Sequence, residues 1–176
     1  MSRRPDRIKS AGVERAAMPE PKQSIFLTDE AATLALGARL APHLRAGDVV
    51  ALAGDLGAGK TTLVRGLIAE LARRAGLAPE TVPSPTFPLV QVYELGAVTL
   101  WHFDLYRLKA IAELAELGWE EALSEGITVV EWPERAAGFL PEPRLDIHLN
   151  WAGERRVACL TGRLAAASLA AILEGA

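Results

Sequence analysis

The central part of the chain carries two hydrophobic patterns that belong to different secondary structures. Residues 48–53 read DVVALA, an apolar run of strand length, which predicts a strand buried on both faces. Leu63, Leu67 and Leu71 then recur at every fourth position, which predicts a helix over about residues 60–75. The expected order here is a buried strand, a glycine-rich turn and a helix.

Weaker patterns on either side complete the set of expected elements. Thr28, Asp29 and Glu30 offer a cap and an acidic first turn for one helix. Two pairs of strands, joined near Gly96 and Gly153, are expected to form hairpins. The expected strands are 24–27, 48–53, 89–94, 98–104, 127–130, 145–151 and 155–161, and the expected helices are 28–41, 60–75, 111–117, 118–126 and a terminal helix from about Arg163.

Composition sets the scale of the molecule. The chain has 176 residues, of which 50% are hydrophobic and 23% charged, and this predicts one folded domain over residues 24–176. Residues 1–23 contain few large apolar side chains and carry six basic and three acidic residues, so they are expected to be a disordered tail. The remainder has 13 basic and 19 acidic residues, a balance that does not favour autonomous binding of nucleic acid.

Two further features bear on where the protein works. The sequence contains no run of 18 apolar residues, so neither a membrane span nor a membrane partner is expected. The single cysteine, Cys159, excludes an internal disulfide and is expected to be a small core residue. We therefore expect a cytoplasmic protein.

The turn between the buried strand and its helix carries a phosphate-binding motif. Residues 54–61 read GDLGAGKT and match G-x-x-x-x-G-K-[ST] in full, in the strand–turn–helix context that the motif requires. Backbone amides at such a helix start can cradle phosphate oxygens, Lys60 can pair with the β- and γ-phosphates, and Thr61 can bind Mg²⁺. A turn that only connected strand and helix would not need the lysine. The expected phosphate-binding residues are Leu56, Gly57, Ala58, Gly59, Lys60, Thr61 and Thr62.

A phosphate loop needs an acidic side chain at a neighbouring strand end. Glu131 follows the clean apolar strand 127–130 and is the better candidate, and Asp104 at the end of strand 98–104 is the second. With Lys60 they form the expected catalytic set. Taken singly, each acid could also be an ordinary solvated carboxylate at a strand end, but finding both beside a phosphate loop favours the functional interpretation.

Three more polar positions allow a functional and a structural interpretation. In Ser84-Pro85-Thr86 a hydroxyl can sense a γ-phosphate, and Thr86 is the expected contact, but a proline turn explains the same residues. His102 is expected to be a hydrogen-bonded strand histidine because no second ligand lies at metal-binding spacing. Arg107 can pair with a phosphate or with Asp104, and the sequence does not decide between them.

The absence of one motif narrows the choice of nucleotide. Since the sequence lacks an N-K-x-D element, guanine has no visible source of selection and ATP is the expected nucleotide, with Mg²⁺. With the surrounding pattern, the motif predicts an α/β protein: a three-layer fold of the P-loop NTPase type, with a central mixed sheet flanked by helices.

Four motifs occur in a fixed order: GDLGAGKTT at 54–62, SPT at 84–86, HFDLYR at 102–107 and EWP at 131–133. In this combination the sequence resembles the TsaE family, the bacterial ATPase of tRNA threonylcarbamoyladenosine synthesis, over about residues 24–161. Phosphate loops alone are widely shared, so the last two motifs carry most of the specificity.

The resemblance implies an ATP-binding and ATP-hydrolysing component of a larger machinery. That machinery adds a threonylcarbamoyl group to the adenosine adjacent to the anticodon in tRNAs that read codons beginning with A. The implied partners are the TsaD and TsaB proteins, of which TsaD transfers the group, and tRNA is reached indirectly through the complex. The implied activity is a Mg-dependent ATPase that is weak alone and stimulated by its partners.

The resemblance also implies roles for individual residues. Thr61 and Glu131 would hold Mg²⁺, and Asp104 would support the metal or the attacking water. Further residues would border the nucleotide, namely Glu30, Glu134 and Gly153.

Two alternatives of a different class stay open at this point. A P-loop kinase for a small metabolite would consume ATP only with a soluble acceptor, although the chain leaves little length for a lid or an acceptor site. A nucleotide-dependent switch would bind ATP tightly without physiological turnover.

Overall fold

The structure is a computed structural model that describes residues 22–78, 80–165 and 168–173. Residues 1–21 of the expected tail therefore lie outside the described residues. The tail's last two residues, Lys22 and Gln23, are the first residues of strand β1.

Seven strands form a single mixed sheet in the order β1-β7-β6-β2-β5-β4-β3. The central strand β2 runs parallel to β5 and β6, and β5 runs parallel to β4. The β3–β4 and β6–β7 pairs are antiparallel hairpins, as expected, and β1 joins β7 as an antiparallel edge strand. The strands are β1 (Lys22–Leu27), β2 (Val49–Ala53), β3 (Val90–Leu95), β4 (Val98–Asp104), β5 (Ile127–Glu131), β6 (Leu145–Ala152) and β7 (Arg155–Gly162).

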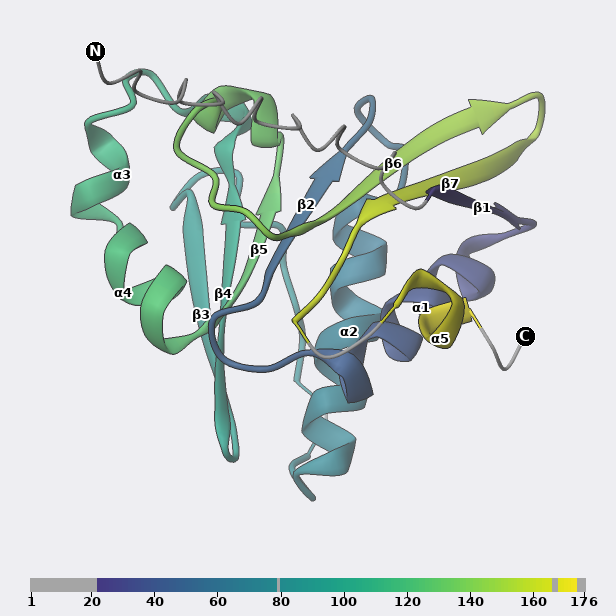
Figure 1. Cartoon of the computed structure of the whole chain (residues 1–176), viewed down its shortest axis with the longest axis horizontal. Coiled ribbons are helices and arrows are strands. Elements are labelled where there is room, and N and C mark those ends of the chain that lie inside the picture. Colours follow the sequence, from purple (N-terminus) through teal and green to yellow (C-terminus); the bar gives the residue numbers. More distant parts are fainter. Residues whose placement is uncertain (1–21, 79, 166–167, 174–176) are drawn as a thin grey trace, which may run out of the picture.

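Helices cover both faces of the sheet, which confirms the expected three-layer α/β architecture (Figure 1). Helices α1 (Glu30–Leu40) and α2 (Lys60–Arg74) pack with α5 (Leu169–Leu173) over the larger hydrophobic core. Helices α3 (Glu113–Glu116) and α4 (Trp119–Glu125) cover a smaller cluster on the other face, beside β4 and β5. Three short 3₁₀ helices complete the elements: η1 (Ala41–His43), η2 (Leu105–Arg107) and η3 (Pro133–Ala136).

The alternation of side chains along β4 and β5 decides which residues face α2. Leu100 of β4 and Val129 of β5 belong to the core beneath α1 and α2, whereas Phe103 belongs to the cluster beneath α3 and α4. Because successive side chains point to opposite faces, the polar residues two positions from Leu100 and Val129 must share their face. His102 and Glu131 are therefore both turned toward α2.

Helices α1 and α2 touch through two glycines. A Cβ added to Gly37 would lie 2.0 Å from the carbonyl oxygen of Leu63, and one added to Gly66 would lie 2.0 Å from that of Leu34. Only a residue without a side chain permits this approach of the two backbones. The contact fixes α1 against the helix that opens at the phosphate-binding motif.

Three expected boundaries need correction. The first is the start of α1, which begins at Glu30: Asp29 is its N-cap, because Asp29 Oδ1 accepts from the Ala32 amide at 2.7 Å. Strand β3 starts one residue late, since Leu89 has a positive φ of 66° that breaks the strand. The terminal helix does not start near Arg163: that residue's amide donates to the Arg144 carbonyl at 3.0 Å, which holds the chain extended, and α5 begins at Leu169.

None of the helices in the described ranges is long and apolar enough to cross a membrane.

Candidate functional site

The turn after β2 has the backbone shape that a phosphate cradle needs. Gly54, Gly57 and Gly59 all have positive φ, at 133°, 77° and 106°. At Gly54 a side chain is also sterically impossible, since its Cβ would lie 2.2 Å from the Leu149 carbonyl oxygen. Helix α2 begins directly afterwards at Lys60. The glycines therefore bend the chain so that the helix start opens toward a cavity.

That cavity has a volume of about 250 Å³ and lies between the phosphate loop, the start of α1 and the end of β5. It gathers eight of the residues expected from the sequence, and three that were not expected. Its lining consists of Glu30, Thr33, Leu56, Gly57, Gly59, Lys60, Thr61, Thr62, Glu131, Trp132 and Arg156.

Lys60 is the buried cation of this cavity, with 4% of its surface exposed. Its Nζ donates to the carbonyl oxygens of Gly54 at 2.6 Å and Asp55 at 2.9 Å. The same ammonium lies 3.9 Å from the ring centroid of Trp132. Burial lowers the pKa of Lys60 below its usual value of 10.5, while nearby carboxylates, Glu131 first, act in the opposite direction.

Glu131 lies at the end of β5, next to the phosphate loop. Its Oε1 accepts a hydrogen bond from the Thr61 hydroxyl at 2.8 Å and also lies 2.8 Å from Nε2 of His102, within hydrogen-bonding distance. Only 2% of Glu131 is exposed. The carboxylate and the hydroxyl are oxygen ligands of the kind that Mg²⁺ prefers. The donor set therefore fits a magnesium ion at this position.

Asp104 is the register neighbour of Glu131, because β4 and β5 pair in parallel. Its Oδ1 accepts from the Tyr106 amide at 3.1 Å, and its Oδ2 accepts from the hydroxyls of Ser84 at 3.0 Å and Thr86 at 2.5 Å. The two strand-end acids thus lie side by side. In this arrangement Asp104 is bound to the Ser84–Thr86 loop and does not line the cavity.

Four further residues named from the sequence also lie outside the cavity lining. Ala58 is buried within the loop, where its amide donates to the Asp55 carbonyl at 3.1 Å. Thr86 is turned toward Asp104, Glu134 is exposed on η3, and Gly153 is at the exposed tip of the β6–β7 hairpin. Their expected contacts with a nucleotide remain predictions.

Three lining residues were missed from the sequence. Thr33 lies one turn after Glu30 on α1, so helical spacing was a usable signal. Trp132 follows Glu131 in the EWP motif, and its positive φ of 60° orients the ring over Lys60. Arg156 comes from β7, far along the chain, and no local pattern marks it.

Arg156 has an unusual environment. Its guanidinium carbon lies 4.3 Å from the ring centroid of Trp151, and its Nε is buried without a partner among the described residues. A Cβ added to Gly59 would lie 3.6 Å from that Nε. This arginine therefore lines the cavity next to Gly59 of the phosphate loop. Arg107, in contrast, packs 5.0 Å above the ring of Phe87, which neither interpretation from the sequence anticipated.

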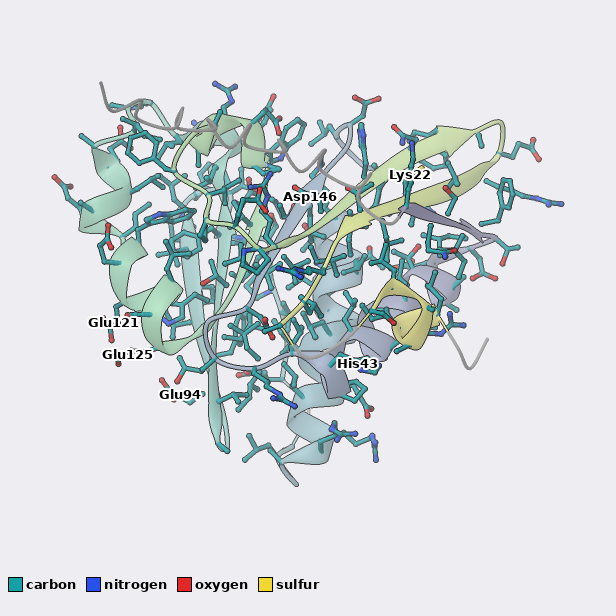
Figure 2. The ribbon with its side chains drawn as sticks, in the orientation of Figure 1. Lys22, His43, Glu94, Glu121, Glu125 and Asp146 are labelled. Atoms are coloured by element: carbon teal, nitrogen blue, oxygen red, sulfur yellow. The ribbon has the colours of Figure 1, made fainter. Side chains whose placement is uncertain are left out.

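A second cavity, of about 310 Å³, lies against the sheet face away from α2. Its lining includes Lys22 of β1 and Asp146 of β6, both labelled in Figure 2. It contains no glycine loop and no helix start. It therefore lacks the features with which the first cavity can bind phosphate.

Comparison with known proteins gives a consistent result. The family described as "Threonylcarbamoyl adenosine biosynthesis protein TsaE" matches residues 27–158. The chain belongs to the TsaE family. Within it, the tRNA threonylcarbamoyladenosine biosynthesis protein TsaE of Nostoc sp. is 42% identical, over 74% of this chain and 79% of that protein. The protein of the same name from Rickettsia felis is 38% identical, over 77% of each chain.

A solved structure supports the same assignment. The crystal structure of Bacillus subtilis YdiB superimposes with a TM-score of 0.65 at 28% identity, covering 83% of this chain and 88% of that chain. TsaE membership and this fold agree with a nucleotide-binding protein whose phosphate loop is the GDLGAGKTT segment.

Proposed function

We propose that this chain is a Mg-dependent ATPase that serves tRNA threonylcarbamoyladenosine biosynthesis. The single observation that carries the proposal is the contact between the phosphate loop and the β5 acid: the Thr61 hydroxyl and Glu131 Oε1 are 2.8 Å apart at the start of α2. A loop that only connected strand and helix would have no reason to bury a lysine, a hydroxyl and a carboxylate together.

Each residue has a defined part in the proposed reaction. Lys60 would exchange its two carbonyl partners for β- and γ-phosphate oxygens, which are stronger acceptors because they are charged. Thr61 and Glu131 would hold Mg²⁺, which when bound neutralises charge that develops on the phosphates. Asp104 would orient water once the hydroxyl of Thr86 leaves it. Burial makes these interactions stronger than they would be in water.

The proposed partners are the TsaD and TsaB proteins, with tRNA reached only through their complex. The folded part of the chain is mildly acidic, which supports contact with proteins more than direct contact with RNA. TsaD would transfer the threonylcarbamoyl group, and this chain would supply ATP hydrolysis. ATP is the proposed nucleotide because no guanine-selecting element is present in the sequence.

The test is steady-state phosphate release with Mg-ATP, by the chain alone and with purified TsaD and TsaB from the same organism. We expect slow turnover alone, faster turnover in the complex, and loss of both with a metal chelator. Fast hydrolysis that ignores the partners would contradict the proposal. ATP consumption that requires a soluble acceptor would identify a kinase, and tight binding without turnover in any complex would identify a switch.

A further inference from the structure

His102 is a buried residue of β4 whose side chain contacts Glu131. It is 0% exposed, and its Nε2 lies 2.8 Å from Glu131 Oε1. The sequence predicts a hydrogen-bonded strand histidine at this position, and the contact with Glu131 agrees with that expectation. The identity of its partner raises a further question, because Glu131 is a proposed metal ligand.

The sheet does not require this side-chain contact. His102 and Val129 are register neighbours, and the β4–β5 backbone ladder continues from Leu100 to Asp104. Packing alone would favour an apolar residue at a fully buried strand position, since burying a polar group costs free energy unless it is paired. A histidine at this position is therefore best explained by what it does to the glutamate.

The direction of the hydrogen bond follows from the neighbouring groups. His102 Nδ1 is buried and has no partner among the described residues. A proton on Nδ1 would leave a buried N–H donor unpaired, which is rarer than an unpaired acceptor. The Thr61 hydroxyl also ends on Glu131 Oε1, which suits a carboxylate that accepts from both sides. The geometry thus assigns Nε2 of His102 as the donor to Glu131 Oε1.

We propose that His102 is a positioning residue that fixes the Glu131 carboxylate for Mg²⁺. This inference rests on the proposed function, since it needs Glu131 to be a metal ligand. Both hydrogen bonds to Glu131 end on Oε1. When Thr61 turns its hydroxyl to the metal, the His102 bond remains and keeps the carboxylate in one orientation. Groups that orient metal ligands in this way affect metal affinity about 10- to 100-fold.

The experiment measures how much Mg²⁺ strengthens the binding of a non-hydrolysable ATP analogue, by calorimetry with and without the metal. His102→Leu removes the donor but keeps a buried side chain. His102→Gln restores it, because the glutamine amide nitrogen is separated from Cα by the same number of bonds as Nε2. We expect His102→Leu to lose at least about tenfold of the Mg²⁺ effect, with binding in the absence of metal unchanged. His102→Gln should retain most of it.

Thr128→Val is the matched control. Thr128 is fully buried on β5, and its hydroxyl donates to the Ala122 carbonyl at 2.8 Å, away from Glu131. The Thr128→Val substitution should lower the free energy of unfolding and leave the Mg²⁺ effect on analogue binding intact. The inference is overturned when His102→Leu keeps the full Mg²⁺ effect, or when Thr128→Val loses as much.

Two outcomes distinguish a failure of this inference from a failure of the proposed function on which it rests. A parent protein whose analogue binding is indifferent to Mg²⁺ overturns the proposed metal site, and the positioning role with it. A parent that responds to Mg²⁺ while His102→Leu responds equally overturns the positioning role alone. If His102→Leu does not fold, His102→Asn replaces it, since its shorter amide cannot reach Glu131 and the comparison with His102→Gln stands.

Discussion

Lys60 illustrates how a charged residue is kept ready for a ligand. Its ammonium is almost fully buried, yet its hydrogen-bond acceptors among the described residues are the neutral carbonyls of Gly54 and Asp55. Carbonyl oxygens compensate a buried charge less well than phosphate oxygens do. The ammonium is therefore held in place while its charge is only partly compensated. This favours exchange of its carbonyl partners for phosphate oxygens when a nucleotide binds.

The first prediction is that Lys60→Ala abolishes ATP binding and leaves the fold intact. The change removes a phosphate-pairing charge at a helix start without altering the core. Calorimetry with Mg-ATP measures the affinity, and circular dichroism checks the fold. Lys22→Ala is the matched control, because Lys22 is exposed beside the second cavity. Unchanged affinity in Lys60→Ala would remove the basis for this site.

The second prediction concerns pH and the same lysine. Since burial holds the folded-state pKa of Lys60 below 10.5, the charged form costs stability at neutral pH. The cost is relieved as pH rises through the lowered pKa toward 10.5, because the folded state then loses its proton first. The free energy of unfolding of the parent should therefore improve relative to Lys60→Met over that alkaline range. A difference that stays flat with pH would contradict the assigned shift.

The third prediction separates the strand-end acids from ordinary surface carboxylates. Glu131→Gln keeps the side-chain shape and should slow hydrolysis in the assembled complex at least tenfold, equivalent to about 1.4 kcal/mol of barrier. Asp104→Asn should also lower turnover. Glu121→Gln is the control, since Glu121, labelled in Figure 2, is exposed on α4 and does not line the cavity; this variant should hydrolyse at the parent rate. Parent rates in both site variants would make these acids structural.

At the scale of elements, most strands and helices follow from local pattern. The buried run of β2 and the leucine stripe of α2 are long and regular, and both appear as expected. The terminal helix is the clear exception. Its alanine- and leucine-rich sequence has high helix propensity. However, the Ala165 amide donates to Asp48 Oδ1 at 3.1 Å, and residues 163–165 lie outside a helix because of such tertiary contacts.

The fourth prediction tests the close approach of α1 and α2. Gly37→Ala should destabilise the protein by at least about 1 kcal/mol, because the new Cβ would overlap the Leu63 carbonyl oxygen. This loss opposes, and outweighs, the gain of about 1 kcal/mol that alanine has over glycine in a helix. Denaturant unfolding gives the measurement. Ala35→Leu, at an exposed position of α1, is the control and should change stability by less than about 0.5 kcal/mol.

At the scale of the whole molecule, the loop of Ser84–Thr86 connects the site to its surroundings. Thr86 binds Asp104 in this structure and must leave it to reach a nucleotide. Next to it, Phe87 is 82% exposed and stacks with Arg107. An exposed aromatic residue beside a loop that must move is a suitable place for a partner to act on the site.

The fifth prediction follows from that coupling. ATP should tighten the proposed complex with TsaD and TsaB, and the complex should tighten ATP by the same factor. Thr86→Ala should reduce both factors while leaving the folded state of the free chain intact. Binding titrations run in both directions supply the measurement. An ATP affinity that is identical in the free chain and in the complex would contradict the coupling.

Those parts of this protein that depend on short stretches of chain can be predicted from the amino-acid sequence. The phosphate loop could be predicted because positive φ at glycines and a helix start are local properties, and the four ordered motifs indicated the TsaE family. The two acids could be named as strand-end residues. No local pattern could predict which residues each of these side chains contacts.

Those partners depend on contacts between segments that are distant in the sequence. The parallel register of β4 and β5 sets Asp104 beside Glu131, and the alternation of side chains turns His102 toward the same carboxylate. Arg156 lies on β7 and lines the same cavity as the phosphate loop, a position that no spacing in the sequence could predict. These contacts join residues far apart in sequence, so they are fixed by how strands pair and helices pack.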